Sequence, residues 1–277
     1  MSSRSPITTA DLVDAHVHLK DASGLDCALA AGISAVRDAG FRQNTECGII
    51  APPRNGPGPK VVSGGWALYR QGGYGSAFGR EIVKAEQIPA EILRLKMTGA
   101  DIIKAMASGM VSFKHPGQVT AGGFDCEELA FIVAEAAAQG LGVMAHANGE
   151  QAIMAAASAG VRSIEHGFFM TERALDLMAT KAVFWVPTMT ALRRATGMSA
   201  APETVPFVEH LILSQLSRLR YAYSVGVPLA IGTDCVLPDP DYRVLYDAEM
   251  ALYEQAGIPR DQVMRIASEG GAKLLGI

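Results

Sequence analysis

The chain has 277 residues, of which 49% are apolar, and a formal net charge of −4. A chain of this length and composition can bury a substantial core, which excludes a disordered or fibrous protein. The mild negative charge, without any run of Lys or Arg, argues against binding to nucleic acid.

Short β-branched or apolar runs alternate along the chain with Ala- and Leu-rich amphipathic segments. The predicted strands, in chain order, are Asp11–Leu19, Ser34–Asp38, Lys60–Gly64, Asp101–Met106, Gly142–His146, Arg162–His166, Val183–Thr188 and Pro228–Asp234. The predicted helices, with apolar positions at spacings of three and four, include Ala90–Thr98, Cys126–Ala138, Glu150–Ala159, Thr171–Thr180, Thr204–Val225 and Tyr242–Gln255.

Strands that alternate with helices indicate parallel pairing through helical crossovers, because antiparallel hairpins need only tight turns. Eight such repeats in a chain of this length favour a closed (β/α)8 TIM barrel, as one domain over residues 1–277. The alternative fold is an open doubly wound sheet. Such a sheet normally has a glycine-rich phosphate loop after its first strand, where this chain has His16-Val-His-Leu-Lys.

Two segments interrupt the alternation, Trp66–Arg80 and Gly109–Phe124. Both follow predicted strands, so we expect them at the carboxyl end of the barrel, where the loops between strands and helices form the pocket. The alternative is that they are surface loops without a functional role.

Four of the six histidines lie at or near the carboxyl ends of predicted strands. His16 and His18 are two residues apart on the first strand, so their side chains point to the same face. His146 ends the fifth strand, His166 ends the sixth and Asp234 ends the eighth. Imidazole and carboxylate together suit Zn, Fe, Mn or Co better than Mg or Ca. Each residue alone could have a structural role, but five of them at one end of a barrel predict a metal centre.

Lys104 lies near the end of the fourth predicted strand, where an apolar run should continue inward. A buried ammonium is costly to desolvate unless it is paired or neutralised. One solution is carboxylation by carbon dioxide, which gives an anionic carbamate able to bridge two metals. The other solution is an ordinary ion pair with a nearby carboxylate.

Signals for export or membrane insertion are absent from the sequence. No stretch of about 18 uninterrupted apolar residues predicts a transmembrane helix, and the polar start Met1–Pro6 lacks the apolar core of a signal peptide. The cysteines form no C-x-x-C pair; they are Cys27, Cys47, Cys126 and Cys235. We therefore expect a cytoplasmic protein with reduced thiols and a small-molecule substrate, without a disulfide framework or a zinc ribbon.

Short motifs along the chain carry a family resemblance. They are Asp14-Ala-His-Val-His-Leu, Gly32-Ile-Ser-Ala-Val-Arg-Asp-Ala-Gly, Ile103-Lys-Ala-Met-Ala-Ser-Gly, Ala145-His-Ala-Asn-Gly, Ser163-Ile-Glu-His-Gly, Val186-Pro-Thr, Gly232-Thr-Asp and Ala272-Lys-Leu-Leu-Gly. In these motifs and in their order, over nearly the whole chain, the sequence resembles the amidohydrolase superfamily. Within it, the branch with prolidase-like dipeptidases and imidazolonepropionase is the most similar.

The resemblance implies a divalent metal centre, with zinc as the first expectation, in which carboxylated Lys104 bridges two ions. The residues that would bind the more buried ion are His16, His18 and Asp234, and those that would bind the second ion are His146 and His166. The implied reaction is hydrolysis of an amide-type carbon–nitrogen bond in a dipeptide, an N-acyl amino acid or a cyclic amide by a metal-activated hydroxide. Asp234 would be the catalytic residue that takes and returns the proton.

Two features depart from the family pattern. Relatives commonly carry a β-sandwich built from residues before the first strand and after the last helix. We expect this sandwich to be missing here, which would leave barrel surface for contact between copies in a homo-oligomer. In addition, Asn148 stands where some dipeptidase-like relatives have a second histidine, so the substrate stays open.

Residues other than the metal ligands also have expected roles. The candidate substrate-binding residues are Trp66, Tyr69, Arg70, Tyr74, Lys114 and His115, because an anionic substrate would need a cation near the metals. Strand alternation predicts that Glu165 faces away from the barrel interior. His210, in a predicted helix, is expected to be a surface or packing residue.

Two alternatives to the binuclear hydrolase stay open. The first is a mononuclear aminohydrolase, a deaminase, in which Lys104 is structural and one ion is held by His16, His18, His166 and Asp234. The second, from a different class of protein, is a metal-binding subunit without turnover.

Overall fold

The structure is a computed structural model that describes residues 11–41, 58–199 and 204–277. The N-terminal segment that we expect not to be a signal peptide, and Cys47, lie outside the described residues. All of the predicted strands and helices lie within the described residues.

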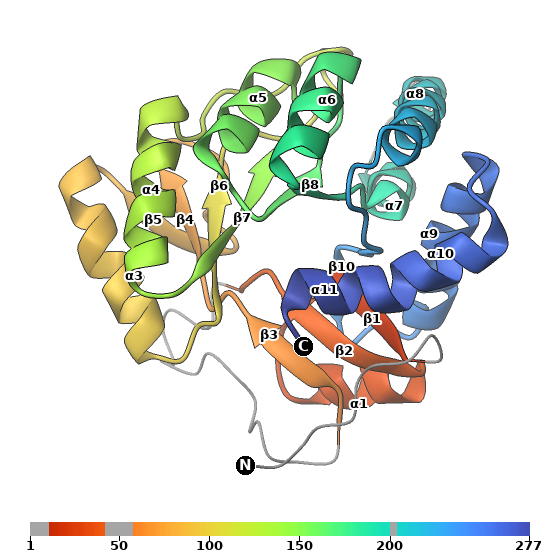
Figure 1. Cartoon of the computed structure of the whole chain (residues 1–277), viewed down its shortest axis with the longest axis horizontal. Helices are drawn as coiled ribbons and strands as arrows, with labels where there is room; N and C mark the ends of the chain where they lie inside the picture. Colours follow the sequence, from red (N-terminus) through yellow and green to blue (C-terminus); the bar gives the residue numbers. More distant parts are fainter. Residues whose placement is uncertain (1–10, 42–57, 200–203) are drawn as a thin grey trace.

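Within the described residues, ten strands form two sheets in which every ladder is parallel. Figure 1 shows how these sheets lie in the molecule. Their orders are β10-β1-β2-β3 and β5-β4-β6-β7-β8-β9. The strands are β1 (Leu12–Leu19), β2 (Ile33–Asp38), β3 (Lys60–Ser63), β4 (Ala67–Arg70), β5 (Gly79–Ile82), β6 (Ile102–Met106), β7 (Gly142–Ala147), β8 (Ser163–His166), β9 (Phe184–Val186) and β10 (Cys235–Leu237). Parallel pairing throughout agrees with the alternation of strands and helices in the sequence.

The segment 228–234 joins the two sheets on one side. On β9, Trp185 donates its N–H to the Pro228 carbonyl, and on β1, Ala15 donates its N–H to the Ile231 carbonyl. The predicted strand Pro228–Asp234 therefore occupies the eighth position of the barrel. It is not a regular strand, however: Pro228 has no N–H to donate, and regular pairing with β1 begins only at β10.

Gly232 allows this segment to lie close to its neighbours. A Cβ atom at this position would lie 2.4 Å from Val186 Cγ1 and 2.8 Å from His16 Cβ. Any larger residue would push the segment away from β1, and Asp234 with it.

The third position of the barrel is shared by β3 and β4, which follow one another after three residues. β3 pairs with β2 and β4 pairs with β6, and Asp101 at the start of β6 donates its N–H to the Ser63 carbonyl. The expectation that Trp66–Arg80 is a loop throughout is therefore wrong, because it contains β4 and the start of β5. Its middle, residues 71–78, forms the connection.

Helices surround the sheets on the outside (Figure 1). They are α1 (Ser23–Ala30), α3 (Ile88–Met97), α4 (Cys126–Ala138), α5 (Glu150–Ala159), α6 (Glu172–Lys181), α7 (Met189–Ser199), α8 (Thr204–Ser224), α9 (Tyr242–Gln255), α10 (Arg260–Arg265) and α11 (Gly271–Leu275). Six of them match the predicted helices to within two residues at each end. This arrangement confirms the predicted (β/α)8 barrel.

The amino end of the barrel is closed by α11. Leu274 and Leu275 pack on Val13, Ala35 and Phe184, which lie at or near the starts of β1, β2 and β9. Since this end is filled by apolar side chains, a polar site can form only toward the carboxyl ends of the strands.

Among the described residues, no helix combines the length and the apolar character needed to cross a membrane. The expected cytoplasmic location and the expected homo-oligomer stay predictions.

Candidate metal centre

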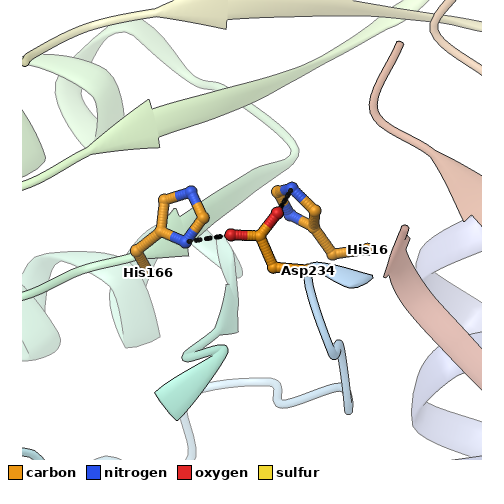
Figure 2. Close-up of side chains that lie close together, drawn as sticks. All are labelled: His16, His166 and Asp234. Atoms are coloured by element: carbon orange, nitrogen blue, oxygen red, sulfur yellow. Dashed lines mark ion pairs between the residues drawn. The ribbon is translucent and has the colours of Figure 1, made fainter. Parts of the chain in front are cut away.

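Three of the predicted ligands converge on one point between β1, β8 and the segment before β10. Ligand atoms of His16, His166 and Asp234 all lie within 4.8 Å of one another (Figure 2). Asp234 Oδ1 lies 3.4 Å from His16 Nε2 and 3.1 Å from His18 Nε2, and Asp234 Oδ2 lies 3.8 Å from His166 Nδ1. The structure thus brings together residues that are up to 218 positions apart in the chain (16 to 234).

The two histidines of β1 each have one ring nitrogen held by the protein. His16 Nδ1 lies 2.7 Å from Glu165 Oε2, and His18 Nδ1 lies 2.5 Å from the Gly40 carbonyl oxygen. Both partners can only accept, so both Nδ1 atoms carry the proton and donate it. In a neutral ring the Nε2 atom then keeps its lone pair, and the Nε2 atoms of both rings face Asp234. Metal-binding histidines in proteins are oriented in this way by carboxylates or backbone carbonyls.

His166 lies in a strained turn at the end of β8. Its φ angle is 65°, and Gly167 donates its N–H to the carbonyl of Glu165, which closes a γ-turn centred on His166. Two side chains hold this turn, because Trp185 Nε1 and Gln215 Nε2 both donate to the His166 carbonyl. Strain of this kind persists only where the surroundings fix it, and such places cluster at functional sites.

The γ-turn also overturns the prediction that Glu165 faces away from the barrel interior. Glu165 on β8 accepts hydrogen bonds from Arg37 Nη2 at 2.8 and 2.9 Å, and Arg37 lies on β2. These strands occupy the sixth and second positions of the barrel, so this pair crosses the interior. Successive side chains point to opposite faces only where the backbone is extended, and the backbone at His166 is not extended. Both Glu165 and His166 therefore serve the site.

Sequence reasoning missed Arg37 as a functional residue. It is fully buried, and besides Glu165 it donates to the Ala15 carbonyl and to Ser163 Oγ. A cation in the middle of a strand of buried residues was the signal that could have revealed it. The same signal did single out Lys104.

The surroundings favour the neutral form of His16 and His146 and the ionised form of Asp234. Burial, and then the charge of Lys104, lower the pKa of His16 to about 4 and that of His146 to about 3. Burial alone would raise the pKa of Asp234, but the neighbouring His16, His18 and His166 hold it well below its usual range. Neutral imidazoles beside a carboxylate are the protonation states in which these groups bind a cation.

His146, at the end of β7, lies next to this group. Its ring centroid is 4.6 Å from that of His166, and its Nε2 lies 2.9 Å from the Gly109 carbonyl oxygen. Asn148 Nδ2 lies 3.1 Å from the same nitrogen. When Nε2 donates to the nearer Gly109 oxygen, which can only accept, Nδ1 keeps the lone pair. His146 can therefore bind a cation beside His166 through Nδ1.

Lys104 on β6 is buried, with 1% of its surface exposed. Within the described residues, no carboxylate lies within 4.0 Å of its ammonium and no hydrogen bond is formed by it. Burial lowers the pKa of Lys104 to about 8, although Glu165 and Asp234 act in the opposite direction. The alternative to carboxylation was an ordinary ion pair between Lys104 and a nearby carboxylate. Within the described residues this ion pair is not formed.

A cavity of about 340 Å³ opens onto the site, and its lining is mainly apolar. The connection 71–78 contributes Tyr74 and Phe78, and the predicted loop Gly109–Phe124 contributes Met110, Val111 and Phe113. The expectation that both interrupting segments help to form the pocket is confirmed.

The predicted substrate-binding residues divide into two groups. Tyr74 lines the cavity, with its ring centroid 4.9 Å from that of His146. The other five lie outside the lining: Trp66, Tyr69, Arg70, Lys114 and His115. Trp66 is buried beneath Arg80, Arg70 pairs with Glu128, and Lys114 and His115 are exposed. His210 is exposed on α8, as expected.

Comparisons with known proteins agree with this geometry. The model of a family described as the amidohydrolase family matches residues 7–277. Ochratoxinase of Aspergillus niger is 31% identical over 205 residues, which are 64% of this chain and 42% of the relative. An uncharacterized protein of Mycobacterium tuberculosis is 25% identical over 276 residues, which are 96% of this chain and 73% of the relative. The chain thus spans less than half the length of the curated ochratoxinase.

Solved structures show the same TIM-barrel fold. A Xaa-Pro dipeptidase with bound methionine in its active site has a TM-score of 0.77 at 24% identity, over 97% of this chain and 75% of that chain. The crystal structure of A. niger ochratoxinase also has a TM-score of 0.77 at 24% identity, over 96% of this chain and 71% of that chain.

Proposed function

Because the chain belongs to the amidohydrolase family, we propose that it is a metal-dependent hydrolase that cleaves an amide-type carbon–nitrogen bond. The observation that carries this proposal is the arrangement of His16, His18 and Asp234. Two imidazole Nε2 atoms face one carboxylate, while the Nδ1 atom of each ring is held by the protein. Nitrogen and carboxylate ligands of this kind fit Zn, Fe, Mn or Co, and zinc is the first expectation.

The residues proposed to hold two ions form neighbouring groups. His16, His18 and Asp234 would hold one ion, and His146 and His166 the other. Lys104 would bridge them after carboxylation, in which its neutral amine forms a bond with carbon dioxide and releases one proton. The absence of an acceptor around the buried ammonium, within the described residues, supports this role. A bound divalent cation supplies Lewis acidity and lowers the pKa of a water from nearly 16 to about 7.

Asp234 is proposed to move the proton during hydrolysis. The pKa of its carboxyl lies well below the usual range beside the neighbouring histidines, and Asp234 lines the cavity through which substrate would reach the centre. A carboxylate in this state can accept a proton from the attacking water and deliver it to the leaving nitrogen. Overall, the amide R–CO–NH–R′ and one water give the acid R–COOH and the amine R′–NH2.

One observation favours the second candidate, a mononuclear aminohydrolase. Among the described residues, the group whose ligand atoms all lie within 4.8 Å has only three members, His16, His166 and Asp234. Such a group suffices for one ion, and Lys104 would then be structural.

The test combines metal analysis with an activity screen. The protein is loaded with Zn, Mn, Co or Fe, with and without bicarbonate, and assayed on N-acyl amino acids, dipeptides, lactams and cyclic ureas. We expect about two metal equivalents, activation by carbon dioxide and release of an amine. About one equivalent, no effect of bicarbonate and release of ammonia from an amino-substituted ring would favour the mononuclear candidate instead.

The variant Asp234→Asn tests the proton-transfer role. Turnover should fall by roughly 10²–10⁴-fold, the usual contribution of general acid–base catalysis, while the fold is kept. The control is Asp247→Asn, which neutralises an exposed carboxylate of α9 that pairs with Arg243. Equal activity of the Asp234→Asn variant and the wild type would contradict the assignment, and a protein that takes up no transition metal would overturn the proposed function.

A further inference from the structure

A buried carboxylate, that of Asp14, lies between the two chain segments that carry His16 and Asp234. Its Oδ1 atom accepts two backbone N–H groups, those of His16 and Thr233, both at 3.1 Å. Its Oδ2 atom accepts from the Thr233 hydroxyl at 2.7 Å and from the Tyr242 hydroxyl at 3.0 Å. One side chain therefore connects the backbone of one proposed ligand with the residue that precedes another.

This carboxylate takes the place of a missing hydrogen bond between two backbones. Ala15 on β1 donates its N–H to the Ile231 carbonyl at 2.8 Å. In a regular parallel ladder, the Thr233 N–H would then donate back to the Ala15 carbonyl. Here that N–H donates to Asp14, and the Ala15 carbonyl accepts from Arg37 Nε instead. Asp14 thus joins β1 to the irregular segment beside it, at the point where the backbone alone does not.

Thr233 extends this connection to the backbone of Asp234. Its hydroxyl donates to Asp14 and accepts the N–H of Cys235 at 3.2 Å, so its contacts bridge across Asp234. The φ angle of Asp234 is 55°, a left-handed conformation that persists only where the surroundings hold it. The Asp234 N–H is itself bound by the His16 carbonyl at 2.7 Å. Together these bonds fix the direction in which the Asp234 carboxylate leaves the backbone.

Tyr242, the first residue of α9, completes the donors around Asp14. An ionised carboxylate has about four acceptor positions, and the two backbone N–H groups and two hydroxyls occupy them. Asp14, Thr233 and Tyr242 are all buried, and none of the three lines the cavity. They can therefore act on the centre only through the residues that they hold.

We propose that three side chains are positioning residues for the carboxylate of Asp234: Asp14, Thr233 and Tyr242. They orient this carboxylate toward the histidines of β1, where it would bind a metal and move the proton. This inference rests on the proposed function, since it assigns the side chains that hold the proposed catalytic group. Because Tyr242 belongs to α9, the orientation depends on the packing of an outer helix against the barrel.

The variant Tyr242→Phe tests the proposal, because it removes one hydroxyl and keeps the ring. The matched control is Tyr246→Phe on the same helix. The Tyr246 side chain is also fully buried, and its hydroxyl donates to the Val13 carbonyl of β1 at 2.9 Å. Both variants lose a buried hydroxyl that bonds to β1, but only the first loses a bond to Asp14.

The two tyrosine variants are compared by metal affinity, in competition with a chelator, and by steady-state kinetics of the metal-loaded protein. Tyr242→Phe should weaken metal binding roughly 10-fold, the lower end of the usual effect of losing a residue that orients a metal ligand. It should also lower kcat and leave KM nearly unchanged, since Tyr242 does not line the cavity. Tyr246→Phe should keep the metal affinity and kcat of the wild type.

Two variants of Asp14 separate its hydrogen bonds from its charge. In Asp14→Asn the amide oxygen can still accept both backbone N–H groups, and the NH2 group can donate to the hydroxyls of Thr233 and Tyr242. Asp14→Ala has no acceptor, so it should bind metal roughly 10- to 100-fold more weakly than the wild type. The Asn variant should retain most of the affinity that the Ala variant loses. An equal loss in both would overturn the inference, and Tyr242→Phe decides the matter if the Ala variant does not fold.

Hydrogen exchange of the metal-free protein separates this inference from the proposed function. Peptides that cover residues 228–237 should exchange faster in Tyr242→Phe than in Tyr246→Phe. If the wild type binds metal and cleaves amides but the two variants have equal metal affinity and kcat, the inference is overturned and the proposed function stands. If the wild type binds no metal and cleaves no amide but the exchange differs as expected, the proposed function fails and the hold on the backbone of Asp234 stands. If the exchange is equal as well, both are overturned.

Discussion

The ion pair between Arg37 and Glu165 makes a sharp prediction about stability. Both side chains are fully buried, and the closest contact between them is 2.8 Å. At an effective dielectric of about 20, two unit charges at this distance attract by ~6 kcal/mol, which offsets the cost of removing both from water. The variant Arg37→Met keeps most of the volume but leaves Glu165 as a buried charge without its cation. Breaking a buried pair in this way costs about 3–5 kcal/mol.

We therefore expect Arg37→Met to lower the free energy of unfolding by about 3–5 kcal/mol, a large part of the 5–15 kcal/mol that is typical of a folded protein. The measurement is urea unfolding of the metal-free protein at pH 7, followed by circular dichroism. The control is Arg260→Met, because Arg260 pairs with Glu254 at the surface with 81% of its side chain exposed. That change should cost less than about 1 kcal/mol.

Two further results would follow from the same reasoning. Replacing both partners, as in Arg37→Met with Glu165→Leu, should recover part of the lost stability, because no buried charge then remains alone. The double variant should still bind metal roughly 10- to 100-fold more weakly, since His16 Nδ1 has lost its acceptor. A loss of less than about 1 kcal/mol in Arg37→Met would refute the view that this pair is desolvated and coupled.

Three other predictions concern pH, packing and metal. Glu249 on α9 accepts hydrogen bonds from Met189 N and Thr190 N at the start of α7, and burial raises its pKa to about 7 from 4.5. Between pH 4.5 and 7 the folded state holds a proton that the unfolded state has released, so this residue stabilises the fold less as the pH rises. The difference in unfolding free energy between the wild type and Glu249→Gln should therefore fall by about 3 kcal/mol over this range. A difference that stays constant with pH would contradict this prediction. In Gly271→Ala the new Cβ would lie 2.6 Å from Val13 Cβ. This clash should lower the free energy of unfolding by about 1–3 kcal/mol, which outweighs the gain of about 1 kcal/mol in helix propensity. A rise in Tm would show that α11 does not pack tightly on β1. Dialysis against a chelator should lower Tm and added zinc should restore it, because an ion at 100 times its Kd stabilises the fold by about 2.7 kcal/mol. A Tm that neither treatment changes would contradict the presence of a bound ion.

The barrel could be predicted from the sequence because its signal is local. Apolar runs and amphipathic segments set the order of strands and helices, and the histidines at strand ends follow from that order alone. The predicted ends of strands differ from the observed ones where the backbone is irregular. The predicted strand Pro228–Asp234 is held mostly by isolated hydrogen bonds to β9 and β1, which depend on neighbours far away in the chain.

The parts of the site that escaped prediction depend on long-range contacts. Glu165 and Arg37 are 128 residues apart, and nothing near either residue indicates the other. The γ-turn at His166 is fixed by side chains 19 and 49 residues away. Composition likewise suggested Lys114 and His115 as the cations of the pocket, but charge alone does not show the direction of a side chain. The cation that lines the cavity is Arg194, on a helix that the pattern did not delimit.

Left-handed backbone at three non-glycine positions of the site makes some substitutions more informative than others. The φ angles of His166, Thr188 and Asp234 are 65°, 51° and 55°. Asparagine and aspartate tolerate this conformation better than most residues, so Asp234→Asn changes the chemistry with little disturbance of the chain, whereas Asp234→Val would disturb both. The same geometry links the centre to a distant helix, since Gln215 on α8 holds the His166 carbonyl. A conservative change at Gln215, which contacts no ligand atom, would relax that turn and shift the orientation of an imidazole.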